Sequence, residues 1–259
     1  MIIDGRQIAE DIKKELKEKL IGRNLKLAIV SVGDDIVSAK YLSRKQKFGE
    51  AVGVETIVYK FADDVSEDGL VEQLHKLAND GSINGIVVQL PLPKHLATEK
   101  LLALIPSEKD VDALTSEARV LPPVVAAIKE ILTRNQVSIE GKRAVVVGRG
   151  RLVGKPAALW LTQNGAIVEI VDLATKNSTT IIAQADLIVS GAGKPGLLKV
   201  GMLKEGVVLI DAATSEAEGR LLGDAEPACA LRCSIFTPVP GGVGPLTIAC
   251  LFKNLAELN

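Results

Sequence analysis

Short apolar runs alternate with longer amphipathic segments along most of the chain. The apolar runs are rich in valine and isoleucine and are bounded by glycine or proline, which predicts buried parallel strands. The longer segments repeat apolar residues every three or four positions, as helices packed on a sheet do. The expected strands span residues 25–32, 54–60, 86–90, 144–147, 166–171, 186–190, 206–211 and 234–236. The expected helices span residues 4–20, 37–52, 66–78, 99–104, 124–135, 153–164, 178–185 and 246–259.

Two helix starts carry recognisable signals. Asp4 with Gln7 three residues later resembles a capping box, and Ser66 precedes a helix with Leu70, Leu74 and Leu77 on its apolar stripe. Strands that alternate with helices at this rhythm predict the α/β class, built from βαβ units around parallel sheets. The segment 107–123 has no clear period, and we interpret it as the junction between two domains.

Composition narrows the classes of function. Of 259 residues 47% are hydrophobic and only 3% aromatic, so the core must consist of aliphatic side chains. The 31 basic and 32 acidic residues nearly balance, which argues against nucleic acid and membrane surfaces as partners. Three cysteines, an odd number, favour a reducing compartment, and the C-x3-C spacing with two distant histidines predicts buried thiols and no metal site. No apolar run approaches about 20 residues and no signal peptide is evident, so we expect a soluble, cytoplasmic protein.

Residues 143–172 form the first candidate site. A buried strand leads into glycines at 148, 150 and 154, a helix follows, and a second strand ends at Asp172. Such glycines let a backbone approach a pyrophosphate at a helix N-terminus, and the acid can accept a hydrogen bond from a ribose 2′-OH. The spacing is one residue looser than G-x-G-x-x-G, and the alternative is that the glycines serve only tight packing.

Three further features could carry chemistry. Tyr41 and Lys45 lie four residues apart and project from one helix face, where a desolvated lysine could exchange protons near neutral pH. Gln89 is polar at the end of an apolar strand, where open α/β sheets bind ligands. The loop TPVPGGVGP (237–245) is stiffened by proline and exposes backbone at its glycines.

Each feature also has a purely structural interpretation. The helix could carry its lysines and arginines as solvated charges, Gln89 could bond the proline turn, and the 237–245 loop could be a rigid turn before the last helix. Asp110 and Asp112 in the junction could each pair with a basic group, and spacing does not rank them.

Together these residues resemble the bifunctional methylenetetrahydrofolate dehydrogenase/methenyltetrahydrofolate cyclohydrolase family. The motifs that match, in family order, are IIDGRQIA (2–9), VGDDIVSAKYLSRKQK (32–47), GIVVQLPLP (85–93), KDVD (109–112), VVVGRGRLVGKP (145–156), TKN (175–177), GKPG (193–196), GD (223–224) and TPVPGGVGP (237–245). The resemblance implies oxidation of 5,10-methylenetetrahydrofolate with NADP⁺, followed by hydrolysis of the methenyl product to 10-formyltetrahydrofolate. Tetrahydrofolate derivatives would be its partners.

The resemblance also implies the domains and their roles. Residues 1–120 would form a folate-binding catalytic domain with helix 246–259 packed back on it, and residues 121–245 a Rossmann-like NADP-binding domain. The catalytic cleft would lie between them, and a homodimer would form through the cofactor domains.

Carried over by position, Lys45 is the catalytic lysine of the cyclohydrolase step, Tyr41 and Gln89 position the substrate and tune Lys45, and Asp112 bonds the pterin ring. The implied substrate-binding residues are Tyr41, Lys45, Val88, Gln89, Leu90, Asp112, Pro240, Gly241, Gly242, Val243 and Gly244. The implied cofactor-binding residues are Gly148, Arg149, Gly150, Arg151, Gly154, Asp172, Thr175 and Thr214.

The choice of cofactor stays open on the residues alone. Arg149 and Arg151 could pair with an adenosine 2′-phosphate, whereas a carboxylate at Asp172 would repel it and favour NAD⁺. The two arginines and the resemblance lead us to predict NADP⁺, with NAD⁺ as the alternative.

The chain departs from the family pattern at three places. The family usually has a longer insert after D-V-D-G and a P-C-T-P turn, whereas this chain has Ala113 and Pro122–Val125 in those places. Gly150 replaces a serine of the cofactor loop, and Asp211-Ala212-Ala213 replaces D-x-G. The change at 113–125 motivates an alternative, a dehydrogenase with weak or absent cyclohydrolase activity. A non-catalytic dinucleotide-binding protein is a third interpretation.

Overall fold

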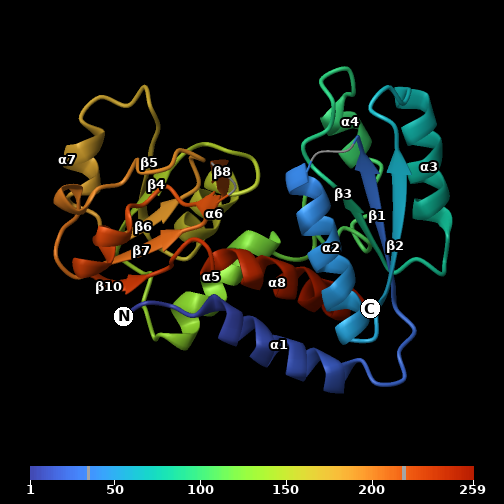
Figure 1. The fold of residues 1–259 in the computed structure, drawn as a ribbon, viewed down its shortest axis with the longest axis horizontal. Helices are drawn as coiled ribbons and strands as arrows, with labels where there is room; N and C mark the ends of the chain where they lie inside the picture. Colours follow the sequence, from blue (N-terminus) through green and yellow to red (C-terminus); the bar gives the residue numbers. More distant parts are fainter. Residues whose placement is uncertain (34–35, 218–219) are drawn as a thin grey trace. The chain divides into compact units, whose positions relative to one another are not determined.

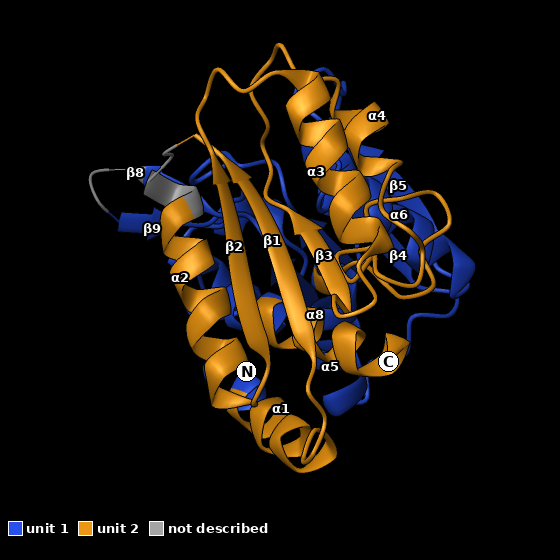
Figure 2. Cartoon of the chain, turned by 90° about the vertical axis from the view of Figure 1, so that its right-hand side faces the viewer, with its two compact units in different colours: residues 1–9, 124–247 blue, residues 10–123, 248–259 orange. Residues whose placement is uncertain are grey.

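The computed structural model describes residues 1–33, 36–217 and 220–259, which form two compact units. Unit 1 contains residues 1–9 and 124–247, and unit 2 contains residues 10–123 and 248–259 (Figure 2). Each unit has its own parallel sheet and its own hydrophobic core. The predicted α/β fold class is therefore confirmed.

Unit 2 is built on a sheet of three parallel strands in the order β2-β1-β3 (Figure 1). Its strands are β1 (Lys26–Val32), β2 (Glu55–Phe61) and β3 (Gly85–Val88). Its helices are α2 (Ile36–Ala51), α3 (Glu67–Asn79) and α4 (Thr98–Leu102), together with most of α1 (Gly5–Lys19) and α8 (Val243–Leu258).

The core of unit 2 forms because α3 places its leucine stripe against the sheet. Ser66 accepts a hydrogen bond from the Gly69 amide at 3.2 Å, which caps the helix as expected. Leu70, Leu74 and Leu77 are buried with residues of β1 and β3. Helix α8 approaches β3 so closely that a Cβ on Gly85 would lie 2.8 Å from Leu255 Cδ1.

Unit 1 is built on five parallel strands in the order β10-β7-β6-β4-β5. These strands are β4 (Arg143–Val147), β5 (Ile167–Val171), β6 (Leu187–Ser190), β7 (Val207–Asp211) and β10 (Cys233–Phe236). The helices are α5 (Pro123–Arg134), α6 (Gly154–Gln163) and α7 (Ser178–Ile182), with 3-10 turns η1 (Val200–Met202) and η2 (Pro227–Leu231). A short antiparallel pair of strands, β8 (Ser215–Ala217) with β9 (Arg220–Leu222), was not predicted because three-residue strands are too short to show alternation.

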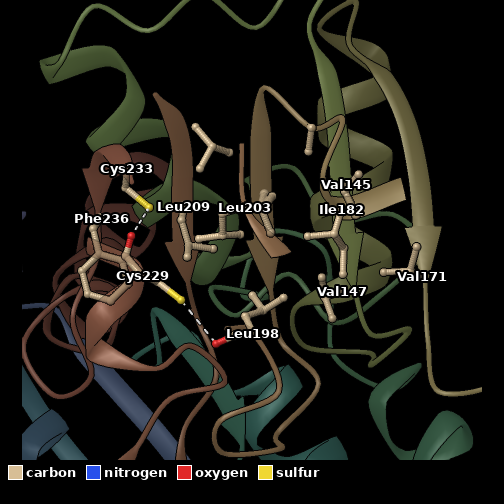
Figure 3. Close-up of a cluster of buried hydrophobic side chains, with 13 residues drawn as sticks. Val145, Val147, Val171, Ile182, Leu198, Leu203, Leu209, Cys229, Cys233 and Phe236 are labelled. Atoms are coloured by element: carbon tan, nitrogen blue, oxygen red, sulfur yellow. Dashed lines mark hydrogen bonds between the residues drawn. The ribbon is translucent and has the colours of Figure 1, made fainter. Parts of the chain in front are cut away.

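One core cluster of unit 1 contains two of the three cysteines (Figure 3). Cys229 Sγ donates to the Leu198 carbonyl at 3.3 Å, and Cys233 Sγ donates to the Cys229 carbonyl at 3.1 Å. Burial raises the pKa of Cys229 to about 11 and that of Cys233 to about 12. All three cysteines are buried thiols, so the prediction of buried thiols is confirmed.

Four predicted ends were wrong by two residues or more. Helix α4 ends at Leu102 rather than 104, helix α7 ends at Ile182 rather than 185, strand β3 ends at Val88 rather than 90, and α8 begins at Val243 rather than 246. The last difference arises because Pro245 fits within the first turn of a helix, where its missing N–H has no intrahelical partner to lose. Among the described residues, no helix is long and apolar enough to cross a membrane.

The first five residues attach to β10 and to the loop that follows it. The Ile3 amide donates to the Phe236 carbonyl, and the Gly5 amide donates to the Gly241 carbonyl, both at 2.9 Å. A Cβ on Gly5 would lie 1.8 Å from Gly242 O, closer than any real contact. Glycine is therefore required at position 5 by space.

We predict that Gly5→Ala lowers the free energy of unfolding by about 1–3 kcal/mol, because the added methyl must displace backbone atoms of Gly242. Urea denaturation followed by circular dichroism measures the change. Gly201→Ala is the matched control in the same unit, since a Cβ there meets nothing within 4 Å. Equal midpoints for the two variants would contradict the close approach.

Candidate active site

Lys45 is a buried lysine on α2 and is held by the residue that follows β3. Its side chain is 9% exposed, and its Nζ donates to Gln89 Oε1 at 3.1 Å. Gln89 is fixed in turn, because its amide donates to the Val30 carbonyl at 2.8 Å and its Nε2 donates to the Leu90 carbonyl at 3.2 Å. The structure therefore brings together two residues that lie 44 positions apart in sequence.

Burial and a neighbouring carboxylate act on Lys45 in opposite directions. Removal from water lowers the pKa of Lys45, and the charge of Asp112 partly opposes that shift. Burial likewise raises the pKa of Asp112, Lys45 opposes it, and Asp110 adds to it. Because desolvation is the larger cause for both groups, each side chain is shifted toward its neutral form. Such a pair is suited to exchanging a proton with a ligand.

Asp112 is positioned by a turn that its neighbour Asp110 organises. Asp110 is fully buried, and its carboxylate accepts hydrogen bonds from the Leu114 amide at 3.1 Å and the Thr115 amide at 2.8 Å. Between them Ala113 adopts a φ of +52°, a left-handed conformation that favours glycine. Spacing did not rank the two aspartates, but the structure distinguishes them. Asp110 accepts hydrogen bonds from the backbone, whereas the charge of Asp112 acts on Lys45.

The remaining expected substrate-binding residues lie in both units. Tyr41 is half-buried one helical turn before Lys45, with the Arg44 guanidinium 5.8 Å from its ring centre. Val88 is buried in β3, and Leu90 precedes a cis peptide bond to Pro91. In unit 1, the loop 240–244 follows the cis Val239–Pro240 bond and enters α8. The Gly242 amide donates to the Pro238 carbonyl at 2.7 Å, which closes that loop tightly.

The expected cofactor loop lies between β4 and α6 in unit 1. Gly148 has a φ of +101°, and a Cβ on it would lie 3.0 Å from Gly191 O. A Cβ on Gly154 would lie 2.1 Å from Gly148 O, whereas one on Gly150 would meet only Gly191 O at 3.8 Å. Gly148 and Gly154 thus allow close packing, and Gly150 keeps the backbone open at the N-terminal side of α6. This combination fits a bound pyrophosphate.

Two charged residues at this loop, Arg149 and Asp172, form an ion pair. Arg149 Nε donates to Asp172 Oδ2 at 2.7 Å, and hydrogen bonds from Arg149 first and Thr175 second hold the pKa of Asp172 below its usual range. The Thr175 hydroxyl donates to Asp172 Oδ1 at 3.0 Å. Arg151 is exposed in the same loop, and Thr214 is exposed between β7 and β8.

A buried carboxylate network, which sequence reasoning missed as a functional feature, supports the other loops at this edge of the sheet. Asp224 accepts from Ser190 Oγ at 2.6 Å, the Ala192 amide at 2.7 Å and the Lys194 amide at 2.6 Å. Asp211 accepts from the Ala225 amide at 2.8 Å, and burial first, with Asp224 contributing, raises its pKa to about 6. The Gly223-Asp224 pair in the sequence was the signal that could have revealed this network. The glycine is needed there because a Cβ on Gly223 would lie 2.1 Å from Asp211 Oδ2.

Metal chemistry finds no support in the described side chains. No group of three or more His, Cys, Asp or Glu residues within 1–33, 36–217 and 220–259 is arranged to hold a metal ion.

Comparison with protein families places both halves of the chain. Residues 3–112 match the model of the tetrahydrofolate dehydrogenase/cyclohydrolase catalytic domain. Residues 122–259 match the model of the NAD(P)-binding domain of tetrahydrofolate dehydrogenase/cyclohydrolase. The two matches follow each other along the chain and leave only the segment 113–121 between them.

Individual proteins agree with these matches. The bifunctional protein FolD of Agathobacter rectalis is 37% identical over 272 aligned residues, which cover 99% of this chain and 98% of the relative. The crystal structure of the bifunctional enzyme FolD from Campylobacter jejuni is 35% identical, with a TM-score of 0.96 over 100% of this chain and 98% of that one. The FolD structure from Trypanosoma brucei, complexed with NADP cofactor and inhibitor, is 33% identical, with a TM-score of 0.94 over 100% and 96%.

We predict that Asp112→Asn lowers the pKa of Lys45 further, because it removes the negative charge that favours the protonated amine. Titration of the Lys45 side chain by NMR of ¹³C-labelled lysine measures the shift. Asp64→Asn, an exposed aspartate of the same unit, is the matched control and should leave Lys45 unchanged. An unchanged or higher pKa of Lys45 in Asp112→Asn would refute the coupling.

Proposed function

We propose that this chain, which belongs to the tetrahydrofolate dehydrogenase/cyclohydrolase family, catalyses two consecutive reactions on one folate. It oxidises 5,10-methylenetetrahydrofolate to 5,10-methenyltetrahydrofolate with NADP⁺ and hydrolyses that product to 10-formyltetrahydrofolate. The observation that carries the second activity is the buried Lys45 held by Gln89 at 3.1 Å. These reactions belong to one-carbon metabolism, and we infer that the formyl product serves purine biosynthesis.

We propose that unit 2 supplies the catalytic groups for the folate and that unit 1 binds the dinucleotide. The backbone at Gly148, Gly150 and Gly154, with the N-terminal end of α6, would hold the pyrophosphate. Thr175 and Thr214 would contact the cofactor from the ends of β5 and β7. When bound, NADP⁺ supplies the acceptor for a hydride leaving the methylene carbon of the substrate.

The cyclohydrolase step needs a group that gives and takes protons beside the methenyl carbon. We assign this role to Lys45, since burial lowers its pKa and Gln89 fixes its Nζ. Water adds to the methenyl carbon and loses a proton to Lys45, and a C–N bond of the resulting carbinolamine then breaks as its nitrogen takes up a proton. Tyr41 would position the substrate from the same face of α2, and Asp112 would bond the pterin ring.

The folate would also contact backbone in two segments. Val88 and Leu90 flank Gln89 at the end of β3, and Pro240, Gly241, Gly242, Val243 and Gly244 form the tight turn into α8. The Gly242 amide donates to the Pro238 carbonyl at 2.7 Å, which gives that turn a defined shape for a flat ligand.

The alternative with weak or absent cyclohydrolase activity rests on the altered segment 113–125. Against it we set the hydrogen bonds from the Leu114 and Thr115 amides to Asp110, which fix the start of that segment next to Asp112. A non-catalytic dinucleotide-binding protein would have no need of a buried lysine with a lowered pKa.

Both activities can be tested together with the matched pair Lys45→Met and Lys47→Met. We expect Lys45→Met to lose cyclohydrolase activity by about 100-fold or more, the scale of general acid–base catalysis, because it removes the proton carrier. Lys47 is exposed on the same helix, so its replacement should leave both activities near those of the unaltered protein. The assay follows NADPH formation and methenyltetrahydrofolate absorbance, with NAD⁺ in parallel.

Three outcomes would count against this function. Full cyclohydrolase activity in Lys45→Met refutes the role of Lys45. Hydrolysis by the unaltered protein no faster than in buffer favours the dehydrogenase-only alternative. An absence of any folate-dependent absorbance change with either cofactor favours the non-catalytic one.

We also infer a homodimer formed through the cofactor-binding units, in a reducing, cytoplasmic setting that buried cysteine thiols suit. Strand β5 is an edge of the five-stranded sheet and pairs only with β4 among the described strands. Ile167 on β5 is 65% exposed, and Leu159 on α6 and Leu173 after β5 are 60% and 69% exposed. Exposed apolar side chains beside an open strand edge suit pairing with a second copy.

We predict that Ile167→Lys converts the dimer to monomer, because a lysine on the strand edge opposes pairing. Sedimentation velocity gives the masses. Ile21→Lys, at an 80% exposed position in unit 2, is the control and should remain dimeric. A monomeric unaltered protein, or a dimeric Ile167→Lys, would refute this interface.

A further inference from the structure

Arg149 and Asp172 form an ion pair at the edge of the sheet where the cofactor is proposed to bind. Arg149 follows β4 and Asp172 follows β5, and these neighbouring strands are in register from Arg143 and Ile167 to Val147 and Val171. Besides the 2.7 Å bond to Asp172, the Arg149 guanidinium contacts the Ile170 carbonyl at 3.5 Å. The pair therefore lies at the carboxyl ends of two adjacent parallel strands, where dinucleotides bind in this class of fold.

The two partners differ in how firmly they are held. Asp172 Oδ1 accepts from the Ala174 amide and from the Thr175 hydroxyl, both at 3.0 Å, and the Asp172 amide donates to Thr175 Oγ1 at 2.9 Å. The Arg149 side chain is 56% exposed, against 34% for Asp172. Arg149 is thus the more exposed partner, whereas the carboxylate is fixed by its own turn.

We propose that Asp172 is a specificity-determining residue. Its fixed carboxylate holds the Arg149 guanidinium and so reduces the ratio by which the protein prefers NADP to NAD. This inference rests on the proposed dinucleotide-binding function. A 2′-phosphate binds best to a guanidinium fork, and here it must take Arg149 from Asp172 while remaining close to a negative charge. A ribose 2′-OH instead donates to a carboxylate, so the same residue supports NAD.

Two residues beside the pair offer a 2′-phosphate nothing. Gly150 has no hydroxyl to offer a phosphate, and the 69% exposed Leu173 next to Asp172 has an apolar side chain. Arg151, exposed in the same loop, carries a second guanidinium, but the competition for Arg149 is relieved only by removing the charge at position 172.

The experiment compares Asp172→Asn with the unaltered full chain. Asparagine keeps an oxygen acceptor for the Ala174 amide and the Thr175 hydroxyl, so the turn is retained while the charge is removed. Isothermal titration calorimetry measures the Kd of NADP⁺ and NAD⁺, and of adenosine 2′,5′-bisphosphate and ADP, which report the adenosine end without the nicotinamide. Glu169→Gln, an exposed carboxylate on the same strand, is the matched control.

We expect Asp172→Asn to bind NADP⁺ and adenosine 2′,5′-bisphosphate about threefold tighter or more, the scale of an exposed charge contact. NAD⁺ should bind more weakly, so the Kd ratio of the two dinucleotides rises in favour of NADP⁺, and Glu169→Gln should leave it unchanged. In Arg149→Gln the preference for NADP⁺ should fall. Asp172→Asn should change the Kd ratio less in the Arg149→Gln background than in the unaltered chain, since the two residues act through each other.

Two results overturn the inference. An unchanged Kd ratio in Asp172→Asn, with folate oxidation intact in the unaltered chain, refutes the role of Asp172 alone. Failure of the unaltered chain to bind either dinucleotide refutes both this role and the proposed function.

Discussion

Parallel strand pairing is the constraint on which the functional features of both units depend. Because parallel strands all end at the same edge of a sheet, the loops after β4, β6, β7 and β10 of unit 1 meet there. Buried carboxylates hold these loops together: Asp224 binds the loop after β6, and Asp211 at the end of β7 binds the Ala225 amide. In unit 2 the same rule places Gln89 at the end of β3, where it can reach Lys45.

Burial then gives selected polar groups their chemistry. Lys45 and Asp112 are both shifted toward neutrality by removal from water, and each limits the shift of the other. The groups around them are backbone-bound and fixed, as Gln89 and Asp110 show. The lysine is thus free to exchange protons while its surroundings keep one geometry, the arrangement that acid–base catalysis requires.

The cofactor edge of unit 1 follows a different physical logic, because its charges are exposed. Arg149 and Asp172 neutralise each other across two adjacent strands, and the carboxylate is the more firmly held partner. Exposed pairs of this kind add little to stability, so their consequence is for the ligand that competes for one partner. The expectation that Arg149 favours NADP⁺ and the expectation that Asp172 favours NAD⁺ thus concern one ion pair.

The sequence by itself determined the elements with a strong period and the family. Burial selects for local apolar patterns, such as the stripe of Leu70, Leu74 and Leu77 and the valine run 145–147, and these patterns can be read from the sequence. The motifs around Lys45 and Pro240 identify the family and so indicate the chemistry. Only the tertiary structure decided which side chains meet. The Arg149–Asp172 bond follows from the register of Val147 with Val171, and the Gly5 requirement follows from a backbone 237 positions away. Such contacts depend on strand register and chain path, which residue spacing does not contain.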